Sequence, residues 1–338
     1  MPLRRILLSP LSLLYHAAVG LRSAAYQRGL VETHSLPGQV ISIGNIEVGG
    51  TGKSPMVIAA AAFLRDCGHQ PAILTRGYGC GLSRQDSMAL LGSRILLMPS
   101  DDRSYRPDEA MMQAEALGTV PVVVGARRHE AAQRFLNETG HRPTHWLLDD
   151  GFQHRRLRRD LDIVLIDRDF KLGRDALLPA GRLREPLSAL NRAHVIVLTR
   201  GELSQLDAKT QTKLRDLGKP MFGAPFVSMP PKAASSNAKS LAAHQRPGLV
   251  TGIARPQRVI DDLHSIGISP HATRLFRDHQ HVVLDSSLIA SCDALITTAK
   301  DWHRDRPVFE ACKLPIYVIN VRPDLSAAQL SNILGSVL

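Results

Sequence analysis

The sequence has few aromatic residues, few cysteines and no long uninterrupted apolar run. Phe, Trp and Tyr make up only 4% of the 338 residues. Proteins that bind single-stranded nucleic acid stack bases on aromatic side chains, so no nucleic-acid partner is expected. The four cysteines include no C-x-x-C pair, which argues against a disulfide framework or a structural zinc site. The hydrophobic content of 44% is typical of a folded protein, and the length suffices for two modest domains.

Negative charge is also scarce relative to positive charge. Lys and Arg number 42 against 31 Asp and Glu, and Arg outnumbers Lys by 33 to 9. Because the planar arginine fork suits phosphate and carboxylate groups, the excess indicates an acidic partner such as a nucleotide or an anionic lipid. A genome rich in arginine codons would give the same excess, so composition alone leaves both readings open. No obligate protein partner is inferred.

The segment 1–28 contains no acidic residue and predicts an amphipathic helix. Ser9 is the expected N-cap, with Pro10 at the first helical position. The apolar stretch 6–20 is too short and too polar to span a bilayer, which needs about 20 apolar residues. One face would carry Leu11, Leu14, Ala18, Leu21 and Ala25, with Arg4, Arg5, Arg22 and Arg28 around it. Such a helix is typical of one that lies on an anionic membrane surface, and a helix packed on the core is the alternative.

Short apolar runs alternate with helical patterns, which predicts an α/β fold with a P-loop NTPase-like parallel sheet and helices on both faces. The apolar runs are 39–45, 71–76, 120–125, 145–150, 161–168 and 193–200, with helices expected near 54–67, 108–118 and 127–138. Residues 29–219 are interpreted as the domain built on this sheet. The Pro- and Ser-rich stretch 220–247 is interpreted as an interdomain connection. A smaller C-terminal α/β domain is expected over 248–338, with helices near 255–266 and 326–337.

The stretch "SIGNIEVGGTGKSPMV", residues 42–57, predicts a phosphate-binding loop between a strand and a helix. Lys53 would reach the β and γ phosphates of ATP, and Ser54 could ligate Mg²⁺. A carboxylate among inward N–H groups would compete with phosphate, so the side chain at position 47 is expected to turn outward, toward an arginine or the water shell of the metal. The candidate ATP-binding residues are Glu47, Val48, Gly49, Gly50, Thr51, Gly52, Lys53 and Ser54.

Three further motifs carry candidate site residues. In "HWLLDDGFQH", Asp149 and Asp150 follow an apolar strand, where P-loop enzymes place the acid that holds Mg²⁺; a turn or helix cap is the alternative. In "LTRGYGCG", Arg76 enters a glycine-rich turn beside Tyr78, a suitable position for a guanidinium that faces phosphate. The segment "LLPAGRLREP" offers Arg182, Arg184 and Glu185 after a Pro-Ala-Gly turn, and solvated loops are the alternative for this segment and for "LTRGYGCG".

Taken in order, these motifs resemble those of the tetraacyldisaccharide 4'-kinases, the lipid A 4'-kinases of Gram-negative bacteria. The matching pieces are "GNIEVGGTGKSP", "RGYG", "RPDEA", "DDGFQH", "LLPAGRLREP", "VTGIARP" and "FRDH". The resemblance implies ATP- and Mg²⁺-dependent phosphorylation of the 4'-hydroxyl of an acylated glucosamine disaccharide 1-phosphate lipid, giving lipid IVA in lipid A biosynthesis. It also implies a place at the cytoplasmic face of the bacterial inner membrane, peripheral or N-terminally anchored. Departures from the family pattern are Glu47, Ala299 where relatives carry Glu, and Arg106-Pro107 where Gly is common.

The resemblance also implies roles for individual residues. Asp108 and His279 would form a catalytic pair across the two domains, with the carboxylate taking or orienting the hydroxyl proton. Lys53 and Arg76 would act on the phosphates. The substrate-binding candidates are Tyr78, Gln153, Arg184 and Glu185.

Other functions remain open at this point. Another P-loop protein, such as a metal-insertion GTPase or an ATP-dependent ligase, would carry the same loop, although no N-K-x-D guanine signature follows. A non-catalytic basic protein of the membrane surface is the alternative outside the enzymes.

Overall fold

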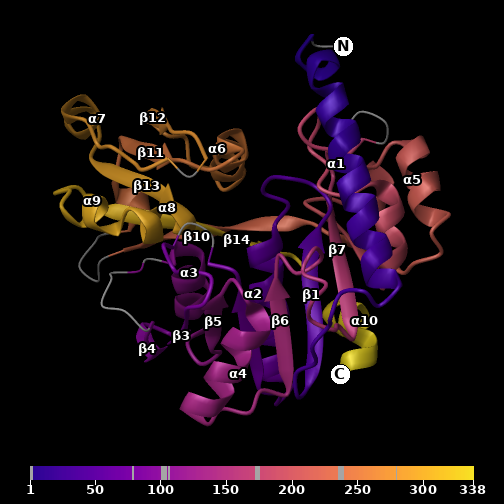
Figure 1. Ribbon diagram of the computed structural model, residues 1–338. Coiled ribbons are helices and arrows are strands. Elements are labelled where there is room, and N and C mark those ends of the chain that lie inside the picture. The colour runs from indigo at the N-terminus through magenta and orange to yellow at the C-terminus, as the bar shows by residue number, and fades with distance from the viewer. Residues whose placement is uncertain are drawn as a thin grey trace. The chain divides into compact units, whose positions relative to one another are not determined.

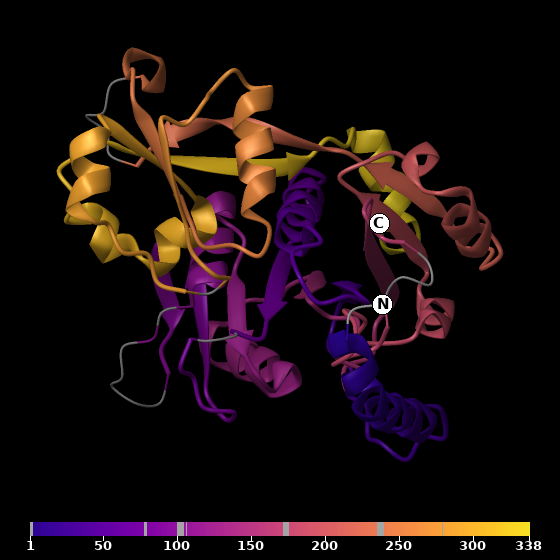
Figure 2. The ribbon, with the colours of Figure 1, turned by 90° about the horizontal axis from the view of Figure 1, so that it is seen from above.

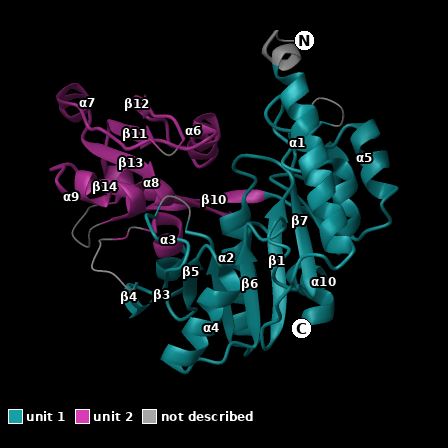
Figure 3. Ribbon diagram, viewed as in Figure 1, with its two compact units in different colours: residues 1–103, 113–225, 323–338 teal, residues 104–112, 226–322 magenta. Residues whose placement is uncertain are grey.

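The chain forms two compact units, distinguished in Figure 3. The computed structural model describes residues 3–77, 80–99, 105, 107–171, 176–234, 240–278 and 280–338, with side chains from Leu8 onward. Unit 1 comprises residues 1–103, 113–225 and 323–338, and unit 2 comprises residues 104–112 and 226–322. Each unit has its own sheet and its own buried apolar clusters.

Unit 1 is built around a sheet in which the described residues form nine strands, in the order β4-β3-β5-β2-β6-β1-β7-β8-β9 (Figure 1). Neighbouring strands from β5 to β9 are parallel, and β3 runs antiparallel to β4 and β5. Every residue of β2, β6, β7 and β8 is buried, which is typical of a parallel sheet covered on both faces. The strands are β1 (Gln39–Asn45), β2 (Pro71–Thr75), β3 (Ser87–Leu91), β4 (Arg94–Leu97), β5 (Val122–Gly125), β6 (His145–Asp149), β7 (Leu161–Asp167), β8 (Val195–Thr199) and β9 (Met221–Ala224).

Helices cover this sheet. α2 (Lys53–Asp66) lies against β1, β2 and β6, and α4 (Arg128–Thr139) lies against β3 and β5. α10 (Ala327–Leu334) packs on α2. The first part of α3 (Asp108–Leu117) belongs to unit 2 and its remainder to unit 1. Unit 1 also contains α1 (Leu3–Gln27), α5 (Ala208–Arg215) and the 3-10 segments Leu187–Arg192, Leu203–Gln205 and Gly335–Val337.

Unit 2 contains a smaller sheet, with the described strand order β10-β14-β13-β11-β12. β11 is parallel to β12 and β13, and β13 is parallel to β14. The strands are β10 (Phe226–Ala233), β11 (Pro247–Thr251), β12 (Ala272–Leu275), β13 (Ala294–Thr298) and β14 (Ile316–Pro323). The helical segments are Leu241–Ala243, α6 (Pro256–Ser265), α7 (Ser286–Ser291), α8 (Ala299–Arg304) and α9 (Arg306–Glu310). The predicted fold class, a P-loop-like parallel sheet with a smaller α/β domain, is confirmed.

The structure divides the chain differently from the boundaries expected from the sequence. The stretch 220–247, interpreted as a connection, contains β9 of the first sheet and β10 of the second. β10 contains Pro230 and Pro231 but lies at the edge of its sheet, where a strand tolerates proline because fewer backbone N–H groups are needed for pairing. The C-terminal helix α10, expected in the smaller domain, belongs to unit 1.

α1 lies at the periphery of unit 1 (Figure 2). It begins at Leu3, so Pro10 lies inside the helix and the predicted cap at Ser9 is wrong. Proline favours the first helical turn because it lacks an N–H group and its ring clashes with the carbonyl four residues earlier, which is why the sequence alone indicated a helix start at Pro10. Among the described residues, no helix combines the length and apolar character needed to cross a bilayer.

Candidate active site

The segment between β1 and α2 forms a tight loop whose shape depends on glycine. Gly49 has φ +119° and Gly52 has φ +83°, in a backbone region that residues with a Cβ avoid. The buried Asn45 side chain donates a hydrogen bond to Thr51 Oγ1 at 2.8 Å, which ties the start of the loop to its end. Lys53 is the first residue of α2. A strand, a glycine-shaped loop and a helix N-terminus together form an arrangement whose N–H groups can hold phosphate.

Glu47, the acid in this loop, is buried, with 1% of its surface exposed. Its Oε2 lies 3.4 Å from Nη2 of Arg182. The backbone of the loop pairs with the same segment, because Val48 N–H donates to the Arg182 carbonyl at 2.8 Å and Glu47 forms an antiparallel bridge with Leu183. The expected arginine partner is present, but the side chain is covered rather than turned outward. Since Val48 N–H is used in this pairing, the phosphate donors would come from later residues of the loop.

Asp149 ends β6, which lies beside β1, so this carboxylate reaches the same edge of the sheet as the loop. Its side chain is buried. Oδ2 accepts a hydrogen bond from Gln113 Nε2 at 2.5 Å and lies 3.5 Å from Oγ of Ser54, the residue after the loop lysine. The predicted neighbours Ser54 and Asp149 are therefore together in the structure.

Asp150 follows in a strained conformation, with φ +50°. Its Oδ1 lies 3.7 Å from Lys53 Nζ, and its Oδ2 accepts a hydrogen bond from Arg184 Nη1 at 2.7 Å. Burial by itself would raise the pKa of the Asp150 carboxyl, but the positive charges of Lys53 and Arg184 hold that pKa below its usual value. Asp150 is therefore an ionised carboxylate between two cations. Backbone strain of this kind is concentrated at functional sites.

Arg128 is a site residue that the sequence interpretation missed. It is the first residue of α4, three residues after the end of β5, and is almost completely buried. Its Nη2 donates to the Asp149 carbonyl and its Nη1 donates to the Asp150 carbonyl at 3.2 Å. Burial and the nearby charge of Arg76 lower the pKa of this guanidinium to about 10, against the opposing charges of Asp150 and Asp149. Arg76, which is exposed after β2, therefore lies close to this edge of the sheet.

Gln153, Arg184 and Glu185 form one network with the loop. Gln153 Nε2 donates to the Asn45 carbonyl at 2.8 Å and to Glu185 Oε1 at 3.0 Å, and its own Oε1 accepts from Arg184 Nη1 at 3.4 Å. Arg192 Nη2 donates to the other oxygen of Glu185 at 2.9 Å. Three of the four residues predicted to bind substrate are thus joined in one network with Asp150 and with Asn45 at the start of the phosphate loop.

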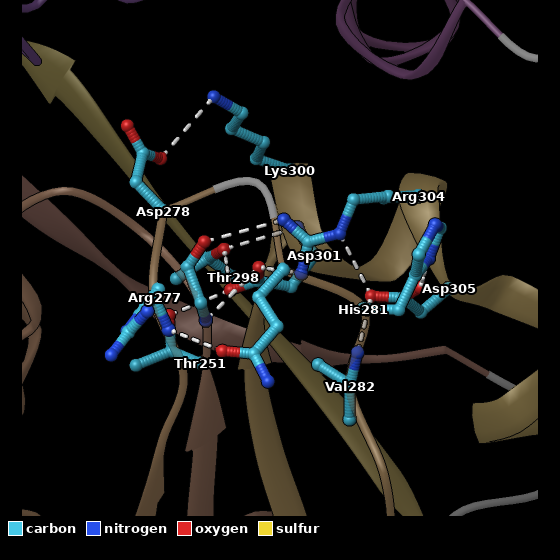
Figure 4. Close-up of polar contacts among 12 residues, drawn as sticks. Thr251, Arg277, Asp278, His281, Val282, Thr298, Lys300, Asp301, Arg304 and Asp305 are labelled. Carbon is cyan, nitrogen blue, oxygen red and sulfur yellow. Dashed lines mark hydrogen bonds and ion pairs between the residues drawn. The ribbon is translucent and has the colours of Figure 1, made fainter. Parts of the chain in front are cut away.

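Asp108 lies at the start of α3, among the residues of unit 2. The sequence interpretation assigned it to the N-terminal domain; it instead shares unit 2 with Asp278, because residues 104–112 group with 226–322. Burial and the neighbouring Glu109 charge raise the pKa of the Asp108 carboxyl, against the opposing charges of Lys300 and Arg304. Lys300 Nζ lies 3.1 Å from Glu109 Oε1. It also lies 3.9 Å from Asp278 Oδ1 (Figure 4).

Two predicted site residues, Tyr78 and His279, lie outside the described residues, as does Arg106. Their roles stay predictions from the sequence. Ala299, the departure before Lys300, is buried in the first turn of α8.

α1 contacts the rest of unit 1 through polar groups. Ser12 Oγ donates to the Leu177 carbonyl at 2.8 Å, and Tyr15 Oη donates to the carbonyl of Arg184 at 2.9 Å. Further along, Arg22 Nη2 donates to the carbonyl of Gln153 at 2.8 Å. The helix is therefore attached to the two segments that also contribute to the network around Asp150.

The opposite face of α1 is apolar and exposed. Leu11, Leu14 and Leu21, predicted on one face, are exposed, Leu21 to 73%. A pocket of about 320 Å³ opens beside the helix, lined by Arg22, Tyr26, Val31, His154, Arg155 and Arg156. Burial, together with the surrounding arginines, lowers the pKa of His154 to about 3, so the imidazole is neutral.

The residues at the edge of the sheet fit a magnesium site. Within the described residues, no group of three or more His, Cys, Asp or Glu side chains could hold a metal ion by itself. Mg²⁺ in phosphoryl-transfer enzymes needs no such group, because it binds one or two carboxylates and takes its other oxygens from water and substrate phosphates. Ser54, Asp149 and Asp150 provide that donor set next to the phosphate loop.

The parallel sheet, the glycine-shaped loop that leads into Lys53 and the acid pair on the neighbouring strand define a P-loop protein of the kinase type. Comparison with known proteins narrows the class. Residues 4–338 match the family described as "Tetraacyldisaccharide-1-P 4'-kinase", and the chain belongs to this family. The resemblance seen in the sequence motifs is confirmed.

Individual relatives are similar to this chain over most of their length. The chain is 36% identical to a tetraacyldisaccharide 4'-kinase of Chlorobaculum tepidum, covering 88% of this chain and 86% of the relative. It is 33% identical to a tetraacyldisaccharide 4'-kinase of Desulfatibacillum aliphaticivorans, and the match covers 94% of this chain and 88% of the relative. A crystal structure of the "apo" form of LpxK from Aquifex aeolicus in complex with ATP is 27% identical, with a TM-score of 0.75 over 97% of this chain and 99% of that one.

Proposed function

We propose that this protein transfers the γ-phosphoryl group of ATP to the 4'-hydroxyl of a tetraacylated glucosamine disaccharide 1-phosphate. The bond between the γ-phosphorus and its bridging oxygen breaks as the bond to the 4'-oxygen forms, and the hydroxyl proton passes to a base. The observation that carries the proposal is the cluster of Lys53, Asp150 and Arg184 at the end of a glycine-shaped loop. Family membership adds the acceptor, a lipid disaccharide.

Unit 1 supplies the nucleotide site. Phosphoryl transfer requires little covalent chemistry from protein, so its rate depends on positioning and on neutralising negative charge. The ionised Asp150 holds Lys53 and Arg184 at the mouth of the loop, and Arg128 holds the backbone of both acids. Ser54, Asp149 and Asp150 would hold Mg²⁺, which neutralises phosphate charge when bound. Arg76 adds a further cation at the same edge.

Unit 2 supplies the base. Asp108 is a carboxylate whose pKa is raised by burial and by Glu109, which makes it a better proton acceptor than an ordinary aspartate. His279, as the sequence resemblance implies, would act with it. Gln153, Arg184 and Glu185 would orient the acceptor through the network that joins them to the phosphate loop.

The acceptor is a lipid, and α1 is suited to a membrane surface. The exposed leucines would enter the boundary between headgroups and acyl chains, while the arginines around the nearby pocket would face anionic headgroups. A peripheral or N-terminally anchored place on the cytoplasmic face of the inner membrane, where ATP is present, follows from this reading.

The test is transfer of labelled γ-phosphate from ATP to the purified disaccharide 1-phosphate lipid in detergent micelles. A matched lipid that lacks the 4'-hydroxyl serves as the control acceptor. Label in the first lipid and none in the second is expected. Hydrolysis of GTP or ATP without labelled lipid would instead favour the GTPase or ligase alternatives, and nucleotide left intact under all conditions would favour a non-catalytic surface protein.

A further inference from the structure

The short helix α8 in unit 2 is held in place by a fully buried carboxylate. Asp301 has no exposed surface and accepts hydrogen bonds from Thr251 Oγ1 at 2.6 Å and from Thr298 Oγ1 at 2.7 Å. Gly252 N–H donates to its other oxygen at 3.1 Å, and Arg304 Nη2 donates there at 2.7 Å. These contacts tie the first turn of α8 to its own N-cap and last residue and to the end of β11, so this turn has little freedom to shift (Figure 4).

The same helix fixes the loop that contains Asp278. Arg304 Nε donates to Oδ2 of the buried Asp305 at 2.9 Å, and that oxygen also accepts from Val282 N–H at 3.0 Å. His281 Nδ1 lies 2.6 Å from the other oxygen of Asp305. At the start of the loop, residue 276 donates its N–H to the Thr251 carbonyl at 2.9 Å. The loop is therefore tied at both ends to residues that also hold α8.

Lys300 extends from this fixed turn toward two acidic groups. Its Nζ lies 3.1 Å from Glu109, next to Asp108 on α3, and 3.9 Å from Asp278 on the loop. Its side chain is only 21% exposed, so its charge is screened less than that of a surface lysine. One cation thus joins the start of α3 to the loop, within a single unit of the chain.

We propose that Lys300 is a positioning residue for the base of the phosphoryl transfer. It holds the start of α3 against the loop that carries Asp278, and its charge favours the ionised, proton-accepting form of Asp108. The inference rests on the function proposed above. The charged groups that act on Asp108 are Glu109 from its own helix and Lys300 and Arg304 from α8; Glu109 raises the pKa of Asp108, and the two cations lower it.

The test is the pH dependence of kcat/KM for phosphate transfer to the disaccharide lipid. Removing the charge in Lys300→Met should raise the pKa of Asp108 further, so activity should fall at a higher pH than in the wild type as the pH is lowered. At neutral pH kcat should fall by about 10- to 100-fold, as expected when a catalytic group loses its position, with little change in KM for ATP. Lys300→Arg keeps the positive charge, so the acid limb of its kcat/KM profile should lie at the wild-type pH. Lys313→Met removes an exposed lysine of the same unit and should leave the profile unchanged.

Glu109→Gln tests the same contact from the other side and covers the case that Lys300→Met does not fold. It removes the negative charge that raises the pKa of Asp108, so the acid limb should move to lower pH, opposite to the shift in Lys300→Met. If Lys300 and Glu109 had a purely structural role, both variants would lose activity, but the acid limbs of their pH profiles would not move in opposite directions. If Lys300→Met folds and its acid limb stays at the wild-type position, or if Glu109→Gln shifts the limb upward, the inference is overturned while the kinase function stands. If the wild type transfers no phosphate to the lipid, the proposed function and this inference fall together.

Discussion

Substitution of Arg128 tests directly whether this residue holds the backbone of Asp149 and Asp150 in place. The Arg128→Met variant removes hydrogen bonds from a guanidinium to the Asp149 and Asp150 carbonyls and leaves those carbonyls without their donors. Hydrogen bonds that involve a charged group contribute about 1.5 kcal/mol each at the low end, so unit 1 should lose about 3 kcal/mol of its free energy of unfolding. The strained Asp150 would also relax, and an error of about 1 Å in such a site lowers kcat by roughly 10²-fold.

The neighbouring residue provides a matched control. Arg127 has the same side chain, but it is exposed and pairs only with Glu130 in the contacts described for it. Arg127→Met should change the free energy of unfolding by no more than about 0.5 kcal/mol and leave kcat near the wild-type value. Urea denaturation and lipid phosphorylation are measured on both variants, with Arg128→Lys as a milder change. Equal effects at positions 127 and 128 would refute the assignment of Arg128 to the site.

Three further predictions concern the loop, the metal site and α1. Lys53→Ala should abolish transfer and leave the thermal midpoint within a few degrees of the wild type, because the lysine pairs with the Asp150 carboxylate rather than with the apolar core; turnover near the wild-type rate would contradict the P-loop assignment. Asp150→Asn should require a higher Mg²⁺ concentration for half-maximal activity, and an unchanged Mg²⁺ curve would assign the metal to other residues. Leu21→Glu should reduce sedimentation with anionic phospholipid vesicles, whereas Gln27→Glu adds the same charge at an exposed polar position of the helix and should reduce it less; equal binding by both variants would argue against contact of the leucine face with lipid.

The fold class and the phosphate loop could be predicted from the sequence because both produce patterns within short stretches of residues. A buried parallel strand is a continuous apolar run, and a loop with glycines at required positions is visible wherever it follows such a run. Ser54 and Asp149 were both expected at the metal site, because the phosphate loop and the acid pair each follow the carboxyl end of an apolar strand. The strand order that makes β1 and β6 neighbours is set by packing between distant segments and has no local signal.

The missed features share one cause: each depends on contact with a segment that is distant in the sequence. Arg127 and Arg128 are adjacent and chemically identical, and only the approach of the Asp149 and Asp150 carbonyls distinguishes them. An arginine shortly after a buried strand is a weak signal that could have suggested the site. Glu47 was expected to avoid the loop by turning outward, but the pairing of residues 182–184 along the loop buries it instead. That pairing joins segments more than a hundred residues apart, so no short-range pattern reveals it.

The packing of α10 on α2 has a consequence for synthesis. α2 begins at Lys53 and is made early, whereas α10, which covers it, and Val337, whose carbonyl lies 2.6 Å from His145 Nε2 at the start of β6, are made only after all of unit 2. A nascent chain that has not yet reached residue 327 therefore presents one side of α2 to solvent, and the helix that begins with the loop lysine lacks part of its support. Ribosomes stalled within unit 2 should accordingly present a nascent chain whose α2 lacks part of its packing.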